Sequence, residues 1–155
     1  MIEQLRNGDS AVRPASMDPI SEFLRTAASD LAGGVISPRI FNDPELYERE
    51  MTRIFARCWC FVAHESEIPE PGDYVLRYIG QDQFIVVRDE DGLIHVLFNK
   101  CTHRGSTVCR VEKGNSSHFR CPYHSWVFKN TGEWSGAPYR KKAYKKLDAG
   151  SWGLA

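Results

Sequence analysis

Two short stretches of the chain contain residue types that can hold a metal. Cys101 and His103 lie in CTHRG, and Cys121 and His124 lie in CPYHSW, with 17 residues between His103 and Cys121. Thiolates and imidazoles are ligands for zinc, copper and iron–sulfur centres. Structural zinc sites usually pair cysteine with cysteine and histidine with histidine, so the order C-x-H…C-x-x-H departs from zinc spacing. The spacing therefore predicts one metal centre built from two mixed pairs.

Two helices are predicted before the segments that contain these ligands. Asp18 is a suitable N-cap and Pro19 suits the first helical position, while Gly33 and Gly34 end the run. A second helix is predicted over NDPELYEREMTRIFARC, with Asp43 as its cap. Its apolar stripe consists of Tyr47, Met51, Ile54, Phe55 and Cys58.

From Trp59 onward the pattern changes to short strands and turns. The strand-like runs are CFVAH, PGDYVLRYIG, DQFIVVRDEDG, LIHVLFN, HFRC and SWVFKN. One such run precedes Cys101 and another precedes Cys121, so two loops at the same end of a sheet would bring the ligands together. The sequence predicts a mainly β fold, a small antiparallel β-sandwich with metal-binding loops, preceded by N-terminal helices. The last stretch, RKKAYKKLDAGSWGLA, has no evident closing element.

Composition excludes several functional classes. The 155 residues carry 20 basic and 20 acidic side chains, without the basic excess of a nucleic-acid-binding protein. No apolar run is long enough to span a membrane, and the N-terminus has no secretory signal. A cytoplasmic location is therefore expected, with either Met1 or Met17 as the start. Five cysteines, an odd number, favour metal or redox chemistry over a disulfide framework.

The motif C-x-H-x₁₇-C-x-x-H resembles the cluster motif of Rieske [2Fe–2S] domains. The resemblance implies that Cys101 and Cys121 ligate the inner iron of the cluster. It implies that His103 and His124 ligate the outer iron through one ring nitrogen each. Their other ring nitrogens would face solvent or a partner. The cofactor expected from the resemblance is thus a Rieske-type [2Fe–2S] cluster.

Four further positions distinguish between kinds of Rieske protein. Respiratory Rieske proteins have a disulfide that would join positions 106 and 123, where this chain has Ser106 and Tyr123. They also have hydroxyl donors where this chain has Trp126 and Phe128. Fewer hydrogen bonds to the sulfurs stabilise the reduced cluster less. The sequence therefore predicts a low-potential centre.

Longer stretches resemble the alpha (large) subunit of bacterial aromatic-ring-hydroxylating dioxygenases. NKCTHRGSTVC matches the first cluster loop, and FRCPYHSWVF with the following TGE and AP matches the second. Ser125 stands where this family usually has glycine. The resemblance covers residues 36–155. We expect residues 1–38 to form a lead-in with one helix, and residues 39–155 to form the Rieske domain with its upstream helix.

The resemblance implies a function in electron transfer. The donor would be a ferredoxin or reductase, and the acceptor a mononuclear Fe(II) held by two histidines and a carboxylate in a C-terminal catalytic domain. No such site is evident here, because His64, His95 and His118 have no neighbour at ligand spacing. The chain is thus expected to be an oxidoreductase component, inactive alone towards substrate. Neighbouring alpha subunits and a beta subunit are further expected partners, with no nucleic acid and no membrane.

Two other interpretations stay open at this point. One is a free-standing Rieske-type ferredoxin that carries electrons, although it would not need the upstream segment FVAHESEIPEPGDY. The other is a zinc-stapled binding module. Cys58, Cys60 and Cys109 are expected to be small buried apolar residues. The basic residues near the C-terminus are expected to be either a solvated surface or a contact for an acidic ferredoxin: Arg140, Lys141, Lys142, Lys145 and Lys146.

Overall fold

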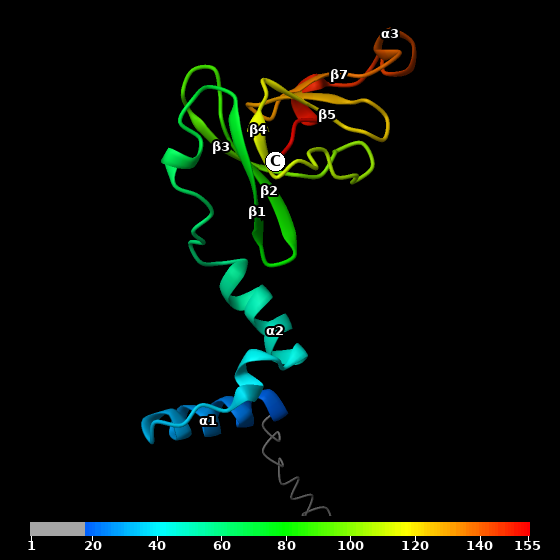
Figure 1. Ribbon diagram of the computed structural model, residues 1–155. Helices are drawn as coiled ribbons and strands as arrows, with labels where there is room; N and C mark the ends of the chain where they lie inside the picture. Colours follow the sequence, from blue (N-terminus) through cyan, green and yellow to red (C-terminus); the bar gives the residue numbers. More distant parts are fainter. Residues whose placement is uncertain (1–17) are drawn as a thin grey trace, which may run out of the picture. The chain divides into compact units, whose positions relative to one another are not determined.

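The computed structural model describes residues 18–155 and divides into two compact units (Figure 1). The N-terminal unit ends at Ala56, and the C-terminal unit comprises residues Arg57–Ala155. The division expected after residue 38 stays a prediction. Within residues 18–155, no helix has both the length and the apolar character needed to cross a membrane.

The N-terminal unit consists of short helices: α1 (Pro19–Ala32), η1 (Pro38–Phe41), α2 (Pro44–Glu50) and the π-helical turn η2 (Met51–Phe55). The predicted caps are confirmed, because Asp18 accepts the Ser21 backbone N–H at 3.2 Å and Asp43 accepts the Leu46 N–H at 3.0 Å. The second helix was predicted to run to Cys58. It is shorter, because its last turn widens into the π-helical turn and ends at Phe55.

The C-terminal unit contains two antiparallel sheets, which confirms the mainly β prediction (Figure 1). The four-stranded sheet has the order β3-β2-β1-β4 and the three-stranded sheet the order β5-β6-β7. The strands are β1 (Asp73–Ile79), β2 (Asp82–Arg88), β3 (Ile94–Phe98), β4 (Lys113–Asn115), β5 (His118–Arg120), β6 (Val127–Lys129) and β7 (Trp134–Gly136). The two short strands β4 and β7 were not predicted. CFVAH is not a strand, and η3 (Glu65–Glu67) follows it.

The main core of the C-terminal unit includes Cys101, Cys109 and Cys121. The core contains residues of both sheets, among them Ile85 and Phe128, which are fully buried. The buried environment predicted for Cys109 is therefore confirmed. The same prediction is wrong for Cys58, which is exposed, and for Cys60, which is only half-buried. Both follow the shortened second helix in a segment without regular structure, which provides no buried helix face for them.

The C-terminal stretch does close the unit, contrary to the expectation from sequence. After α3 (Arg140–Ala143) and η4 (Ala149–Ser151), the chain returns to the sheets. Leu154 N–H donates to the Gly132 carbonyl at 2.7 Å, and Phe98 N–H donates to an Ala155 oxygen at 2.6 Å. Trp152 packs against the core and Leu154 is buried in it. The last residues thus connect β3 with the turn before β7.

Candidate metal centre

The two cysteine-containing loops share one backbone design. In each, the fifth residue donates its N–H to the carbonyl of the cysteine: Gly105 to Cys101 at 2.7 Å, and Ser125 to Cys121 at 2.9 Å. Each cysteine N–H donates in turn to the residue that follows its loop, Ser106 or Trp126, at 2.8 Å. Two five-residue loops are therefore closed in the same way. His103 is the third residue of its loop, whereas His124 is the fourth of its own.

The fifth residue of each loop adopts a left-handed backbone conformation. Gly105 has φ of 69° and Ser125 has φ of 56°. This conformation costs a residue with a Cβ roughly 1–2 kcal/mol, and glycine avoids that cost. The departure of Ser125 from the family's glycine therefore leaves the loop geometry intact but strains it.

This strain predicts opposite effects for two substitutions. Ser125→Gly should raise the free energy of unfolding by up to about 1 kcal/mol, because relief of strain exceeds the entropic cost of glycine. Gly105→Ala should lower it by about 1 kcal/mol, because nothing lies within 4 Å of the added Cβ and only backbone strain enters. Urea titrations of both variants measure the two changes. Equal signs would show that the left-handed conformation is not the controlling factor.

The four predicted ligand residues converge as two pairs. Cys101 is 2 % exposed and Cys121 is 1 % exposed, and their side chains are within hydrogen-bonding contact. The rings of His103 and His124 are half-buried, and their centroids lie 4.7 Å apart. The loops therefore hold a buried pair of thiols and a less buried pair of imidazoles.

Burial determines the protonation of this site in the absence of metal. It raises the pKa of the Cys101 thiol to about 11, with the Cys121 thiol as a further cause. The backbone N–H groups of His103 and Arg104 approach the same sulfur and oppose this rise, because they stabilise a thiolate. Burial lowers the pKa of His103, as do the positive charges of His124 and Arg104. His103 is thus held neutral, the form of imidazole that binds metals.

The imidazole pair has the features expected of metal ligands. The Nδ1 atoms of His103 and His124 are both buried, and neither finds a hydrogen-bond partner among the described residues. Buried polar atoms are normally hydrogen-bonded, so each such atom requires an explanation. The indole N–H groups of Trp126 and Trp134 are also unpartnered, but they are donors only. A ring nitrogen can ligate a metal, and these two belong to the same loops as the thiols.

The candidate ligands lie as a thiol pair and an imidazole pair. Across residues 18–155, no three His, Cys, Asp or Glu side chains converge closely enough to hold one metal ion. Tetrahedral zinc needs all four ligands around one point. A Rieske [2Fe–2S] cluster instead takes two thiolates on one iron and two imidazoles on the other, which matches the two pairs.

Aromatic side chains enclose one side of the site. Trp126 is 1 % exposed and stacks on His103 with ring centroids 4.8 Å apart and an interplanar angle of 6°. The Tyr123 and His124 ring centroids lie 3.7 Å apart, and Tyr123 is exposed. One imidazole therefore has a buried indole beside it, and the other has a phenol at the surface.

Asn99 is a positioning residue that the sequence analysis did not identify. It is 1 % exposed and lies two residues before Cys101. Its amide donates to the carbonyl of Cys109 at 2.7 Å and to the side chain of Gln83 at 2.6 Å. Its oxygen accepts the N–H groups of Cys109 at 2.8 Å and Val108 at 3.2 Å. The Asn99 side chain thus connects the segment that follows the first loop to Gln83 of β2. In the sequence, only its position inside NKCTHRGSTVC pointed to a role near the site.

The remaining histidines have local partners. His64 Nδ1 caps η3 by accepting the Ser66 N–H at 3.2 Å, and His118 contacts the Ser117 hydroxyl at 3.0 Å. His95 Nε2 lies 2.7 Å from the buried Asp89 carboxylate, a partner that the sequence analysis did not anticipate. No third ligand joins this pair within the described residues. The structure therefore supports structural roles for all three.

The partners of the Asp89 carboxylate lead us to expect that the hairpin between β2 and β3 is sensitive to acid. The hydrogen bond from His95, followed by the Leu93 and Asp91 N–H groups, lowers the pKa of Asp89 below its usual range. A lowered folded-state pKa gives stability that is present above the unfolded value of about 4 and lost as pH falls further. Below about pH 4, the free energy of unfolding should decrease less steeply with falling pH in Asp89→Asn than in the wild type. Chemical denaturation at several pH values tests this, and an unchanged acid slope would refute it.

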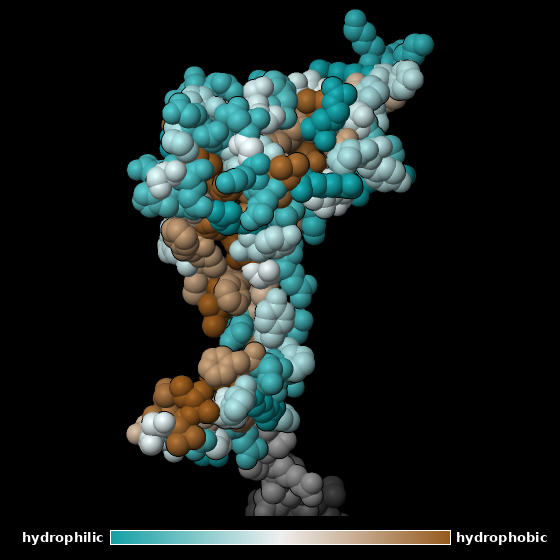
Figure 2. Space-filling model, viewed as in Figure 1, coloured by the Kyte–Doolittle hydropathy of each residue, from teal (hydrophilic) through white to brown (hydrophobic). Residues whose placement is uncertain are grey.

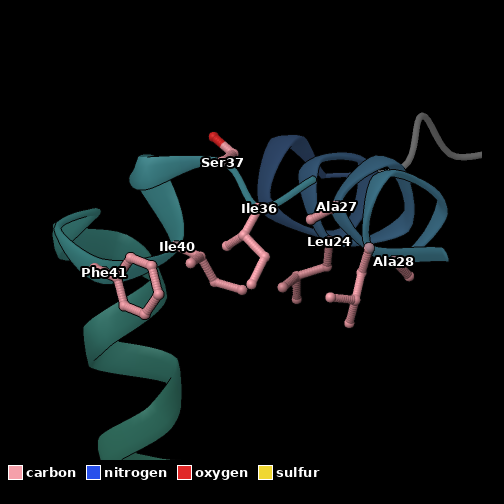
Figure 3. A pocket seen from close by; sticks show the side chains of 8 residues that line it. Leu24, Ala27, Ala28, Ile36, Ser37, Ile40 and Phe41 are labelled. Carbon is pink, nitrogen blue, oxygen red and sulfur yellow. The ribbon is translucent and has the colours of Figure 1, made fainter. Parts of the chain in front are cut away.

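An apolar groove lies in the N-terminal unit, between α1 and η1 (Figure 3). Its volume is about 440 Å³, and Figure 2 shows hydrophobic surface over this unit. The lining side chains are Leu24, Ala27, Ala28, Leu31, Ile36, Ser37, Ile40 and Phe41. None of them can ligate a transition metal or titrate near neutral pH, so the groove offers no chemistry of its own.

The fold, the paired loops and the donor set are those of a Rieske domain. Residues 58–148 match the Rieske [2Fe–2S] domain family, and the chain belongs to that family. More specifically, it is a Rieske domain of the kind found in aromatic-ring-hydroxylating dioxygenase alpha subunits.

Particular relatives give the detail behind this assignment. The alpha subunit of an N,N-dimethyl phenylurea N-demethylase from Sphingobium sp. is 50% identical over 136 residues, 87% of this chain and 30% of the relative. The alpha subunit of benzene 1,2-dioxygenase from Pseudomonas putida is 40% identical over 126 residues, 81% of this chain and 28% of the relative. A crystal structure of naphthalene 1,2-dioxygenase from Rhodococcus sp., bound to indole, aligns with a TM-score of 0.81 and 49% identity over 90% of this chain and 32% of that one. The chain thus spans about 30% of the length of these relatives.

Proposed function

We propose that this chain is the electron-accepting Rieske module of an aromatic-ring-hydroxylating dioxygenase alpha subunit. One observation carries the proposal: two matched loops bring two buried thiols together with two imidazoles whose buried Nδ1 atoms lack partners. In this proposal Cys101, Cys121, His103 and His124 hold a [2Fe–2S] cluster, the thiolates on one iron and the imidazoles on the other. The cluster supplies reversible one-electron chemistry when bound.

The residues around the ligands have their own parts in this mechanism. The core around Cys101 and Cys121 excludes water from the sulfurs, and the N–H groups of His103 and Arg104 stabilise the Cys101 thiolate. Trp126 orients the His103 ring by stacking on it. Neither Trp126 nor Phe128 offers a hydroxyl to the sulfurs, which supports a potential near the lower end of the Rieske range of about −150 to +300 mV.

The partners follow from the relatives, which are oxygenase subunits several times longer than this chain. We infer that a ferredoxin or reductase supplies the electron. We further infer that it passes to a mononuclear Fe(II) in a catalytic domain, of the same or a neighbouring alpha subunit, with a beta subunit as a further partner. In this account residues 39–155 form the Rieske domain with its upstream helix. These similarities favour the oxygenase role over a free-standing Rieske ferredoxin.

A reduction and turnover experiment tests the proposal. The purified, cluster-loaded chain is reduced with dithionite, then mixed with oxygen and with benzene, naphthalene or a phenylurea. We expect uptake of one electron per chain and reoxidation by oxygen, without hydroxylated or demethylated product. Failure to take up an electron would refute the electron-transfer role. Product formed by this chain alone would refute the assignment of oxygen chemistry to another domain.

A further inference from the structure

The segment after the second loop carries a cluster of basic residues, here called the basic segment: Arg140, Lys141, Lys142, Lys145 and Lys146. All five side chains are exposed, and no acidic residue occurs between Glu133 and Asp148. None of the five forms an ion pair with another residue of the described part of the chain. Figure 2 shows a hydrophilic surface where α3 projects from the C-terminal unit. In a chain of zero formal charge, this segment is a local positive field.

The basic segment is joined to the candidate metal centre by a series of ring contacts. The Arg140 guanidinium lies over the Trp134 ring, 4.7 Å from its centroid. The Trp134 and Trp126 rings lie 5.2 Å apart, and Trp126 stacks on His103. Tyr144, which precedes Lys145, lies edge-on to Trp126 with ring centroids 5.5 Å apart. Packed aromatic rings therefore lead without a gap from the charged surface to a ligand imidazole.

Two ring contacts fix the charged stretch beside the candidate metal centre. The backbone that carries the charges is anchored at two points: Arg140 lies over Trp134, and Tyr144 lies edge-on to Trp126, the indole that stacks on His103. Positive charge at such a place attracts a negatively charged partner to the short route towards the cluster. It also raises the rate of encounter by about 10- to 1,000-fold at low salt.

We propose that the basic segment is the docking surface for an acidic one-electron carrier protein. The electron leaves the docked carrier, which is oxidised by one electron. It would enter the cluster that the four ligands hold, on the side of His103, and the cluster would be reduced by one electron. Trp126 positions the His103 imidazole by stacking on it, and Trp134 lies between Trp126 and Arg140 on the route. The inference rests on the proposed function, because it names where the electron enters.

Stopped-flow reduction of the cluster-loaded chain tests this docking surface. The probe is an acidic plant-type [2Fe–2S] ferredoxin, whose potential near −400 mV makes the transfer downhill. The variant Lys141→Glu/Lys142→Glu reverses two charges of the basic segment. The matched control Arg25→Glu/Lys113→Glu reverses two exposed charges, in α1 and β4, that form no ion pair within residues 18–155.

We expect the basic-segment variant to slow the second-order rate at least about tenfold at low ionic strength, and the difference to shrink at high salt. The control should change the rate by less than about twofold. Equal rates for the two variants, with the wild type still reduced, would overturn the docking surface alone. A wild type that holds its cluster but is not reduced at any salt concentration would overturn the proposed function as well.

The ring contacts are tested at saturating carrier, where docking no longer limits the rate. Trp134→Leu should lower the limiting rate, and Trp134→Phe should restore most of it. Both variants should keep the midpoint potential and the visible spectrum of the wild type. A misfolded site would change both quantities. A Leu variant with the wild-type limiting rate would exclude the indole from the route.

Discussion

A Cys121→Ser chain is expected to purify without the visible absorption of an iron–sulfur cluster. Cys121 is buried in the core, where its thiol contacts the thiol of Cys101. Its own backbone N–H donates to the Trp126 carbonyl. A serine hydroxyl does not replace a thiolate, the ligand that iron–sulfur clusters require. The loss should be complete rather than partial. It should also lower thermal stability, because cluster binding stabilises only the folded state.

The matched control for this substitution is Cys58→Ser. Cys58 is exposed and lies outside both loops, so this variant should keep full absorption and iron content. Iron and sulfide analysis of both variants, with visible spectra, measures the outcome. A Cys121→Ser chain with wild-type iron and colour would contradict the ligand assignment, as would a Cys58→Ser chain that loses them.

Asn99→Ala is expected to cause the largest loss of stability among substitutions that leave the ligands in place. The change removes four hydrogen bonds and leaves the buried N–H and carbonyl of Cys109 without their partner. Each buried unsatisfied group costs about 1–3 kcal/mol, so we expect a loss of about 3 kcal/mol or more. The first loop should also loosen, because the Asn99 side chain holds the backbone of Val108 and Cys109, which follow the loop.

Asn115→Ala provides the comparison for this prediction. The Asn115 amide donates to the Pro71 carbonyl at 2.8 Å and to Asp73 at 2.9 Å, but its side chain is exposed. Water can replace those partners, so the loss should stay below about 1 kcal/mol. Denaturant unfolding measures both variants, and cluster release on mild heating reports loosening of the loop. Similar losses of stability in the two variants would contradict the role given to Asn99.

The fold was predictable where pattern alone determines structure. β1 and β2 are apolar runs with three consecutive buried residues each, a clear turn separates β2 from β3, and α1 has both its Asp18 cap and its Gly33 stop. β4, with the sequence KGN, is exposed and forms only because its backbone pairs with β1. CFVAH is apolar, but no neighbouring strand pairs with it, so it stays irregular. Strand pairing between distant segments is the information that local pattern lacks.

The convergence of the four candidate ligands was predictable from residue type and spacing, because each mixed pair follows a strand-like run. Their role as ligands stays a prediction. What surrounds them was not predictable. The stacking of Trp126 on His103 and the contact of Arg140 with Trp134 depend on tertiary packing. Asn99 was equally hidden, because a single asparagine beside a motif does not reveal which backbone groups it will satisfy. The closing role of Leu154 likewise depends on contacts with residues far away in the sequence.

An electron paramagnetic resonance spectrum of the dithionite-reduced, purified chain tests the central claim most directly. The account predicts a Rieske-type signal with a low average g-value, because two imidazoles rather than thiolates ligate one of the irons. The signal should persist in Cys58→Ser and vanish in Cys121→Ser. A colourless, silent protein with stoichiometric zinc would contradict the account. The two loops would then be a structural staple, and no electron would pass through them.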